Sequence, residues 1–162
     1  DRDFGLNMQL KWPNDLYLAG KKCGGVLIDL VQSANQDWIV IVGVGLNVAM
    51  SKLGSDEIDQ PWTDLSTHST VKVSRHEVGA RILEAVVPLL SSWQVGSFGQ
   101  WRESWSRRDL MAGRQISVQQ GGHAIAGRAD GVDFSGALRV VTNEGLTVVQ
   151  SGEASMLRGE TL

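Results

Sequence analysis

The feature that most constrains the fold is an apolar stretch at residues 38–48, interrupted only by Gly43, Gly45 and Asn47. Its length is that of a strand, and a near-continuous apolar run is typical of a strand that is buried on both faces. It is too short to cross a bilayer, which takes about 20 apolar residues in a helix. We therefore predict a buried strand here.

The two glycines of this stretch lie on one face of the predicted strand. Side chains alternate along a strand, so Gly43, Gly45 and Asn47 point the same way and form a flat surface with one polar group at its end. Glycine weakens a strand interior, and its repetition on one face suggests a ligand or another backbone lying close against it. A bulge, or tight packing under a helix, explains the same pattern.

Composition narrows the class of protein. The 162 residues are 42% hydrophobic and 20% charged, as in a soluble globular domain. A net charge of −3 argues against duplex nucleic acid as the main partner. The three histidines are scattered, so we predict no transition-metal site. The single cysteine excludes an internal disulfide, and together with the acidic start it leads us to expect a cytoplasmic protein with no membrane contact.

Short strands are predicted before the apolar stretch. Residues 6–12 alternate between apolar and polar, and Pro13 should end that strand because proline cannot donate to the ladder. Residues 16–18 resume it briefly, and residues 26–31 form another strand. Residues 32–37 are polar and predict a loop.

Helices are predicted in the middle of the chain. Ser74 and Glu77 have the spacing of a capping box, and apolar residues recur behind them at helical intervals. Pro88 should kink this helix or end it early. A second helix is predicted from Ser97, with Phe98, Trp101 and Trp105 on one side.

From residue 114 onward the pattern changes to short alternating segments joined by glycine-rich turns. Ile116 and Val118 alternate before a Gly-Gly turn, and residues 138–142 and 146–148 alternate on either side of Asn143-Glu144-Gly145. Short strands joined in this way predict a small barrel.

Two polar motifs flank the predicted strands. Residues 21–25 read KKCGG, in which a lysine beside small residues can reach an anionic ligand. Residues 11–15 read KWPND, a strand ended so that Asn14 and Asp15 stand at a sheet edge. A solvated turn and an ordinary Asx turn are the structural alternatives.

Taken together, these motifs resemble one family. KWPND, KKCGGVLIDL and VGVGLNVAM, in this order and spacing, are similar to the biotin protein ligases, and residues 50–62 resemble that family's adenylate-binding loop. The resemblance implies an α+β fold: a partial mixed or antiparallel catalytic sheet with helices, followed by a small SH3-like β-barrel. We accordingly predict two domains, residues 1–110 and 111–162.

The resemblance also implies roles for particular residues. Lys22 would contact the biotin carboxylate and the adenylate phosphate, and Gly25, Gly43 and Gly45 would line the biotin pocket. Asp15 would orient either a Mg²⁺-bound phosphate or the incoming lysine amine. The adenylate would be bound by Asn14, Asn47, Leu53 and Trp62. Asn47 would read the adenine edge, Trp62 would cover the adenine, and Asn14 would lie near the nucleotide. Leu53 and Ile58 would be the apolar residues of the loop.

The reaction implied is ATP-dependent formation of biotinyl-5'-AMP and transfer of biotin to a lysine of the biotin carboxyl carrier protein. ATP would enter with Mg²⁺, and no resident metal is expected. We also expect a homodimer that forms through a sheet edge, with Ile28, Leu30 and Val31 on the contacting strand. DNA would be a partner only if the full-length protein carries an N-terminal winged helix.

The sequence departs from the family pattern in two ways. The Gly/Arg-rich loop that precedes KWPND in the family does not occur in residues 1–162, so we expect this chain to be a fragment that is inactive in isolation. An extra residue before Arg158 puts its usual position beside the phosphates in doubt. A lipoate ligase or octanoyltransferase, and a noncatalytic protein-binding module, are the alternative functions.

Overall fold

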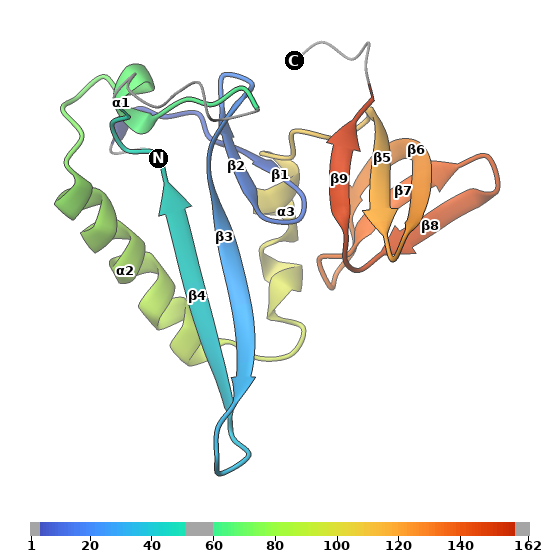
Figure 1. The fold of residues 1–162 in the computed structure, drawn as a ribbon, viewed down its shortest axis with the longest axis horizontal. Helices are drawn as coiled ribbons and strands as arrows, with labels where there is room; N and C mark the ends of the chain where they lie inside the picture. Colours follow the sequence, from blue (N-terminus) through green and yellow to red (C-terminus); the bar gives the residue numbers. More distant parts are fainter. Residues whose placement is uncertain (1–3, 51–59, 158–162) are drawn as a thin grey trace. The chain divides into compact units, whose positions relative to one another are not determined.

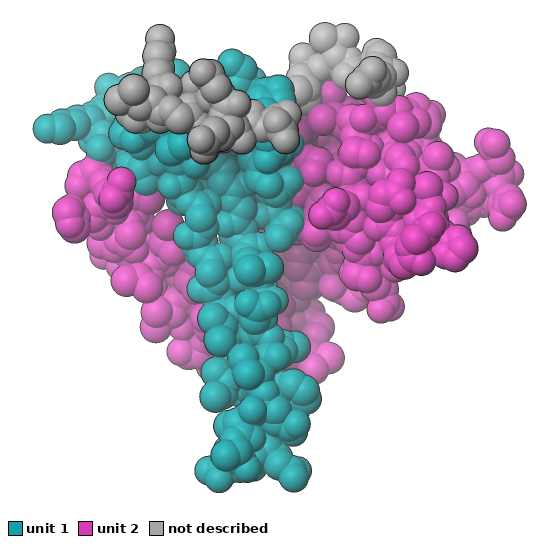
Figure 2. All heavy atoms as spheres, viewed as in Figure 1, with its two compact units in different colours: residues 1–8, 14–73 teal, residues 9–13, 74–162 magenta. Residues whose placement is uncertain are grey.

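A computed structural model describes residues 4–50 and 60–157. The chain divides into two compact units, coloured separately in Figure 2: unit 1 comprises Asp1–Met8 and Asn14–Val73, and unit 2 comprises Gln9–Pro13 and Ser74–Leu162. The element order, with antiparallel sheets and separate helices, confirms the predicted α+β class. Among the described residues, no helix combines the length and the apolar character needed to cross a bilayer.

Unit 1 is built on three antiparallel strands, β2 (Asp15–Leu18), β3 (Lys21–Gln32) and β4 (Trp38–Leu46). The predicted strand at residues 26–31 is the outer part of β3, which starts at the lysine pair. The predicted polar loop joins β3 to β4 as a turn, and the resulting long hairpin extends well past β2 (Figure 1). A short helix, α1 (Leu65–His68), follows later in the chain.

The apolar residues of this hairpin are exposed, which corrects the prediction that both faces of β4 are buried. Trp38 is 67% exposed, and Val40 and Ile41 are each 50% exposed. On β3, Leu27 and Ile28 are similarly open to solvent. The apolar run predicted that other parts of the protein cover both faces of β4. The described residues do not cover them.

Unit 2 contains the helices. α2 (Arg75–Ser92) begins directly after Ser74, as predicted, but the Ser74 side chain makes no capping hydrogen bond. The helix continues through Pro88 to Ser92, so of the two outcomes predicted for Pro88, a kink or an early end, the early end does not occur. The predicted second helix is instead a 3₁₀ turn, η3 (Ser97–Gln100), followed by α3 (Arg102–Ser106). The Phe98 and Trp105 rings meet edge to face at 6.3 Å.

Unit 2 also contains the β-rich C-terminal region that was predicted. Its antiparallel sheet has the order β8-β7-β6-β5-β9. Two of its strands, β6 and β9, were not predicted from the sequence. The bounds are β5 (Gln115–Gln120), β6 (His123–Val132), β7 (Leu138–Thr142), β8 (Gly145–Val149) and β9 (Glu153–Met156). The pairing of the described strands leaves β8 and β9 as the two edges, so closure into an SH3-like barrel stays a prediction.

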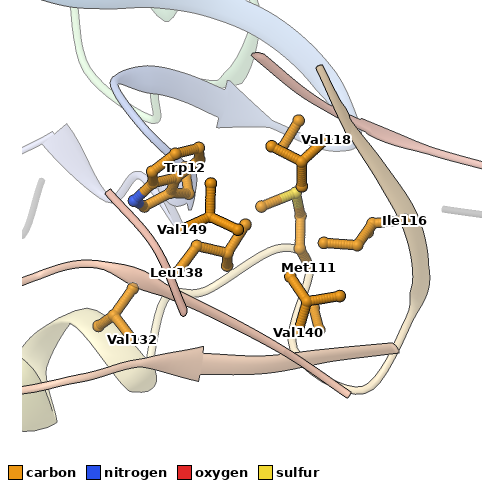
Figure 3. Packing of buried hydrophobic residues seen from close by; sticks show 10 residues of the cluster. Trp12, Met111, Ile116, Val118, Val132, Leu138, Val140 and Val149 are labelled. Atoms are coloured by element: carbon orange, nitrogen blue, oxygen red, sulfur yellow. The ribbon is translucent and has the colours of Figure 1, made fainter. Parts of the chain in front are cut away.

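The main hydrophobic core belongs to this sheet (Figure 3). Alternate residues point inward, which is why Ile116 and Val118 on β5 are both fully buried. Trp12 packs in the same cluster although it is far away in sequence, and its indole Nε1 donates to the Gly136 carbonyl at 3.1 Å. The N-terminal strand, seen as β1 (Gln9–Lys11), therefore ends by supplying an aromatic to the C-terminal core.

This core can be tested with a matched pair of leucines. Leu138 on β7 is fully buried, whereas Leu146 on the adjacent β8 is 53% exposed. Leu138→Ala should lower the free energy of unfolding by about 2–5 kcal/mol, because it removes buried methyl groups and leaves a cavity. Leu146→Ala should cost about 0.5 kcal/mol or less. Urea unfolding of both variants measures the difference, and equal losses would contradict the described core.

Candidate functional site

Unit 1 contains a cavity of about 800 Å³ over the inner part of the hairpin. This volume falls within the roughly 300–1,000 Å³ typical of small-molecule sites. Its walls come from the start of β2, from β3 and β4, and from the segment just before α1. The lining residues are Asn14, Asp15, Lys22, Gly24, Gly25, Val26, Leu27, Gly43, Val44, Gly45, Leu46, Asn47, Gln60 and Trp62.

Gly25, Gly43 and Gly45 form what we call the glycine floor of this cavity. Gly25 pairs with Gly45, and Gly43 pairs with Leu27, so all three glycines belong to one face of the sheet. A Cβ built on Gly43 or Gly45 would approach the nearest atom only at 3.8 or 3.9 Å, which is ordinary contact. Packing therefore does not require glycine at these two positions, and the alternatives of a bulge or tight packing under a helix do not explain them.

Gly24 is glycine for a different reason. A Cβ at Gly24 would lie 2.3 Å from the Gly45 carbonyl oxygen and 2.7 Å from the Leu46 side chain. Contacts this short require the backbone to move. Gly24 thus permits the close pairing of β3 and β4, whereas Gly25, Gly43 and Gly45 leave the floor of the cavity free of side chains.

A β-bulge at Cys23 determines where Lys22 points. Leu16 pairs with Gly24 but Tyr17 pairs with Lys22, so the register shifts by one residue at Cys23. The shift places Lys22 on the same face as Tyr17, and hence as Asp15, as bulges do when they redirect a side chain. The Lys22 ammonium consequently lies 2.6 Å from Asp15 Oδ1.

Cys23 itself is buried in the bulge, and its thiol donates to the Leu16 carbonyl at 3.4 Å. Burial raises the pKa of Cys23 to about 11. Because the thiolate is the reactive form, this cysteine is not a nucleophile at neutral pH.

The segment that carries Trp62 is held by the backbone of Lys22. Lys22 N donates to the Pro61 carbonyl at 3.2 Å, and Thr63 N donates to the Lys22 carbonyl at 2.9 Å. Trp62 and Lys22 are therefore bridged as in a parallel sheet. One residue thus provides both the positive side chain of the cavity and the backbone that fixes the aromatic at its edge.

Both asparagines of the site also bind backbone. Asn14 Nδ2 donates to the Val26 carbonyl at 2.8 Å, and Val26 N donates back to the Asn14 carbonyl at 2.9 Å. Asn47 Nδ2 donates to the Thr63 carbonyl at 3.0 Å. These bonds hold the ends of the strands around the cavity in a defined position.

The structure brings together nearly all of the residues singled out in the sequence. Every predicted site residue except Leu53 lines the one cavity. Leu53, Ile58 and Arg158 lie outside the described residues. Gln60 also lines the cavity and was missed, although it stands two residues before Trp62 in a segment already identified as a binding loop.

The charges of the cavity define what it can bind. Among the described lining residues, Lys22 is the only cation and Asp15 the only carboxylate. Their side chains are 30% and 15% exposed, so both are partly screened from water. One lysine suits a single carboxylate or phosphate, and one carboxylate suits the type of Mg²⁺ that stays bound mainly to water and substrate phosphates. The other described lining residues are uncharged.

Two segments of the chain match protein-family models. Residues 2–47, which include the KWPND and lysine motifs and the glycine floor, match the model described as "Biotin/lipoate A/B protein ligase family". Residues 112–157 match "Biotin protein ligase C terminal domain". The chain belongs to the biotin protein ligase family.

Similar proteins in this family include both enzymes and enzyme-repressors. The bifunctional ligase/repressor BirA of Salmonella typhimurium is 26% identical over 94% of this chain and 48% of its own length. The biotin–[acetyl-CoA-carboxylase] ligase of Mycobacterium tuberculosis is 29% identical over 92% of this chain and 53% of its own length. The chain thus spans about half the length of these two relatives.

The fold is also that of a biotin protein ligase. A structure of the Aquifex aeolicus enzyme, in complex with biotin and ATP, matches with a TM-score of 0.81 and 28% identity. The match covers 98% of this chain and 65% of the Aquifex chain.

The difference between Gly24 and Gly45 gives a test of this site that needs no ligand. Gly24→Ala should lower the free energy of unfolding by about 1–3 kcal/mol, because its Cβ would meet a backbone carbonyl. Gly45→Ala should leave it unchanged or slightly raised, since alanine restricts the unfolded chain and finds open space. Thermal unfolding of the two variants compares them, and destabilisation by Gly45→Ala would mean that packing does require this glycine.

Proposed function

We propose that this chain supplies part of the active site of a biotin protein ligase that forms biotinyl-5'-AMP and pyrophosphate from biotin and ATP and transfers biotin to a protein lysine with release of AMP. The observation that carries the proposal is the glycine floor beside Lys22: three glycines on one face, two of which packing does not require. Such a surface suits a flat, mostly neutral ring system whose single carboxylate reaches a cation.

For the first half-reaction, we propose that Lys22 stabilises negative charge. The biotin carboxylate would attack the α-phosphate of ATP and pyrophosphate would leave, so negative charge on the transferring phosphoryl group has to be stabilised as the anhydride forms. Lys22 lies at the edge of the floor, where both the carboxylate and that phosphate would be within its reach. Positioning and charge account for this chemistry without a covalent enzyme intermediate.

Asp15 holds Lys22 in the ligand-free arrangement, and we propose that substrate displaces it. The ion pair at 2.6 Å keeps the ammonium at the cavity wall rather than in solvent. When an anionic substrate takes the ammonium, the Asp15 carboxylate would exchange its contact with Lys22 for either a Mg²⁺-bound phosphate or the incoming lysine amine. Both roles fit a carboxylate next to the reaction centre.

The nucleotide side of the site is proposed to be Trp62 together with Asn14 and Asn47. Trp62 is a half-buried aromatic at the edge of the cavity, suited to stack on adenine. Asn47 has an amide oxygen that can accept from the adenine amino group while its Nδ2 donates to Thr63. Leu53 is proposed for the same region on the family resemblance alone.

The carrier and other partners are likewise proposals. The Mycobacterium tuberculosis relative is a biotin–[acetyl-CoA-carboxylase] ligase, which supports a biotin carboxyl carrier protein as the acceptor. The exposure of Ile28 and Leu30, at 60% and 64%, and of Val31, at 45%, supports the expected homodimer contact on β3. The match of residues 112–157 to a C-terminal domain model supports the division at residues 110 and 111.

Lys22 and its neighbour Lys21 allow a charge-matched test in the full-length protein. Lys22→Ala should slow biotin-dependent ATP–pyrophosphate exchange roughly 100-fold or more, because a charge aimed at the transition state is lost. Lys21 is exposed and does not line the cavity, so Lys21→Ala should stay near the parent rate. Equal rates for the two variants would remove Lys22 from the mechanism.

The same assay distinguishes the nearest alternative. A family model that covers both biotin and lipoate ligases matches residues 2–47, so lipoate is the competing substrate. Exchange that depends on lipoate but not on biotin would replace the proposed substrate. If neither acid supports exchange or binds the full-length protein, the result would favour the alternative function, a noncatalytic protein-binding module.

We further propose that residues 1–162 alone do not complete the reaction. Lys22 is the only cation among the described lining residues, whereas a triphosphate needs several, and arginine is the usual residue for phosphate recognition. The expected result for the isolated chain is no measurable biotin-dependent pyrophosphate exchange, with the full-length protein as positive control. Exchange by the isolated chain would contradict this.

A further inference from the structure

Asp64 makes two hydrogen bonds that connect separate parts of unit 1. Its Oδ2 accepts from Met50 N at 2.8 Å, just after the end of β4. Its Oδ1 accepts from Thr67 N at 2.8 Å, which caps α1. The residue is only 6% exposed. Its two carboxylate oxygens thus hold the chain leaving β4 against the chain that follows Trp62.

The residues around Asp64 extend this connection into the site. Asn47 Nδ2 donates to the Thr63 carbonyl at 3.0 Å, and Leu65 N donates to the Asn47 carbonyl at 2.9 Å. Thr63 Oγ1 lies 2.8 Å from His68 Nε2. The segment after Trp62 is therefore bound to the end of β4 on one side and to Lys22 on the other.

Only an ionised carboxylate fits this position well. Each oxygen accepts from a backbone N–H, and such charge-assisted bonds are stronger than neutral ones. Burial alone would raise the pKa of Asp64, but the hydrogen bonds from Thr67 and Met50, with the charge of His68, lower it below the ordinary value. An asparagine would turn an NH₂ group toward one of the two N–H donors, and a serine could satisfy only one of them.

We propose that Asp64 is a positioning residue for the nucleotide half of the site: by tying Met50 to α1, it fixes Trp62 at the edge of the cavity. Asp64 does not line the cavity and touches no substrate in this role. The inference rests on the proposed function, because it assumes that Trp62 contacts the nucleotide. It predicts that the loss of Asp64 is felt in nucleotide binding and not in biotin binding.

The test compares four variants of the full-length protein. Asp64→Ser keeps a capping oxygen for Thr67 but not the bond to Met50, and Asp64→Asn keeps one acceptor oxygen. Ser66→Ala is the control, since it removes a hydroxyl bond to the Val48 carbonyl from the same helix. Trp62→Ala sets the size of the effect expected when the aromatic itself is lost.

The kinetic readout is the KM for ATP and for biotin in pyrophosphate exchange. Asp64→Ser and Asp64→Asn should raise the KM for ATP roughly tenfold, in line with loss of a hydrogen bond to a charged group, and leave the KM for biotin within about twofold. Ser66→Ala should change neither. Parallel increases in both constants, or a parent-like KM for ATP in Asp64→Ser, would overturn the proposal.

Amide hydrogen exchange supplies a readout that does not depend on catalysis. Asp64→Ser should speed exchange at Met50 N–H, which loses its acceptor, and at Thr63 N–H, which reports on the Trp62 segment; Ser66→Ala should not. Faster exchange without a change in the KM for ATP would leave Asp64 a structural cap only, which overturns its positioning role. An unchanged KM for ATP in Trp62→Ala would instead refute the nucleotide contact of the proposed function.

Discussion

The register in which β3 pairs with β4 is the constraint on which the whole site depends. Gly25 lies opposite Gly45 and Leu27 lies opposite Gly43, so three glycines come to one face. A slip of β4 by one residue would turn Gly43 and Gly45 to the other face and bring Val44 to the floor in place of one of them. Gly24 permits this close pairing, because a Cβ at that position would lie 2.3 Å from the Gly45 carbonyl oxygen.

Around this pairing the site is organised by backbone hydrogen bonds more than by contacts among side chains. Lys22 binds the residues on either side of Trp62, and Asn47 binds the same segment from the end of β4. Asp64, which belongs to that segment, accepts from Met50 N beyond β4. Such an arrangement fixes the positions of a few groups while the cavity between them stays empty of side chains. That is the preorganisation that binding and charge stabilisation require.

Sequence reasoning correctly grouped three motifs, although each of them also had a structural explanation. The glycine repeat, Lys22 and the Asn14-Asp15 pair were each interpreted as part of a ligand surface, and the structure brings them to one cavity. It failed for β4, whose apolar run led us to expect two covered faces although Trp38 and Ile41 are exposed. It also missed α1 and Asp64, because a four-residue helix is too short to produce a periodic pattern.

The sequence by itself determined which groups are available: a strand with glycines on alternate positions, a lysine beside them, and a C-terminal set of short strands. Only the tertiary structure decided that Lys22 and Asp15 meet, because simple alternation puts Lys22 on the face of Gly24, opposite to Gly25. The bulge at Cys23 reverses that assignment. It is a property of how β2 and β3 pair, and a local pattern in one strand does not contain it.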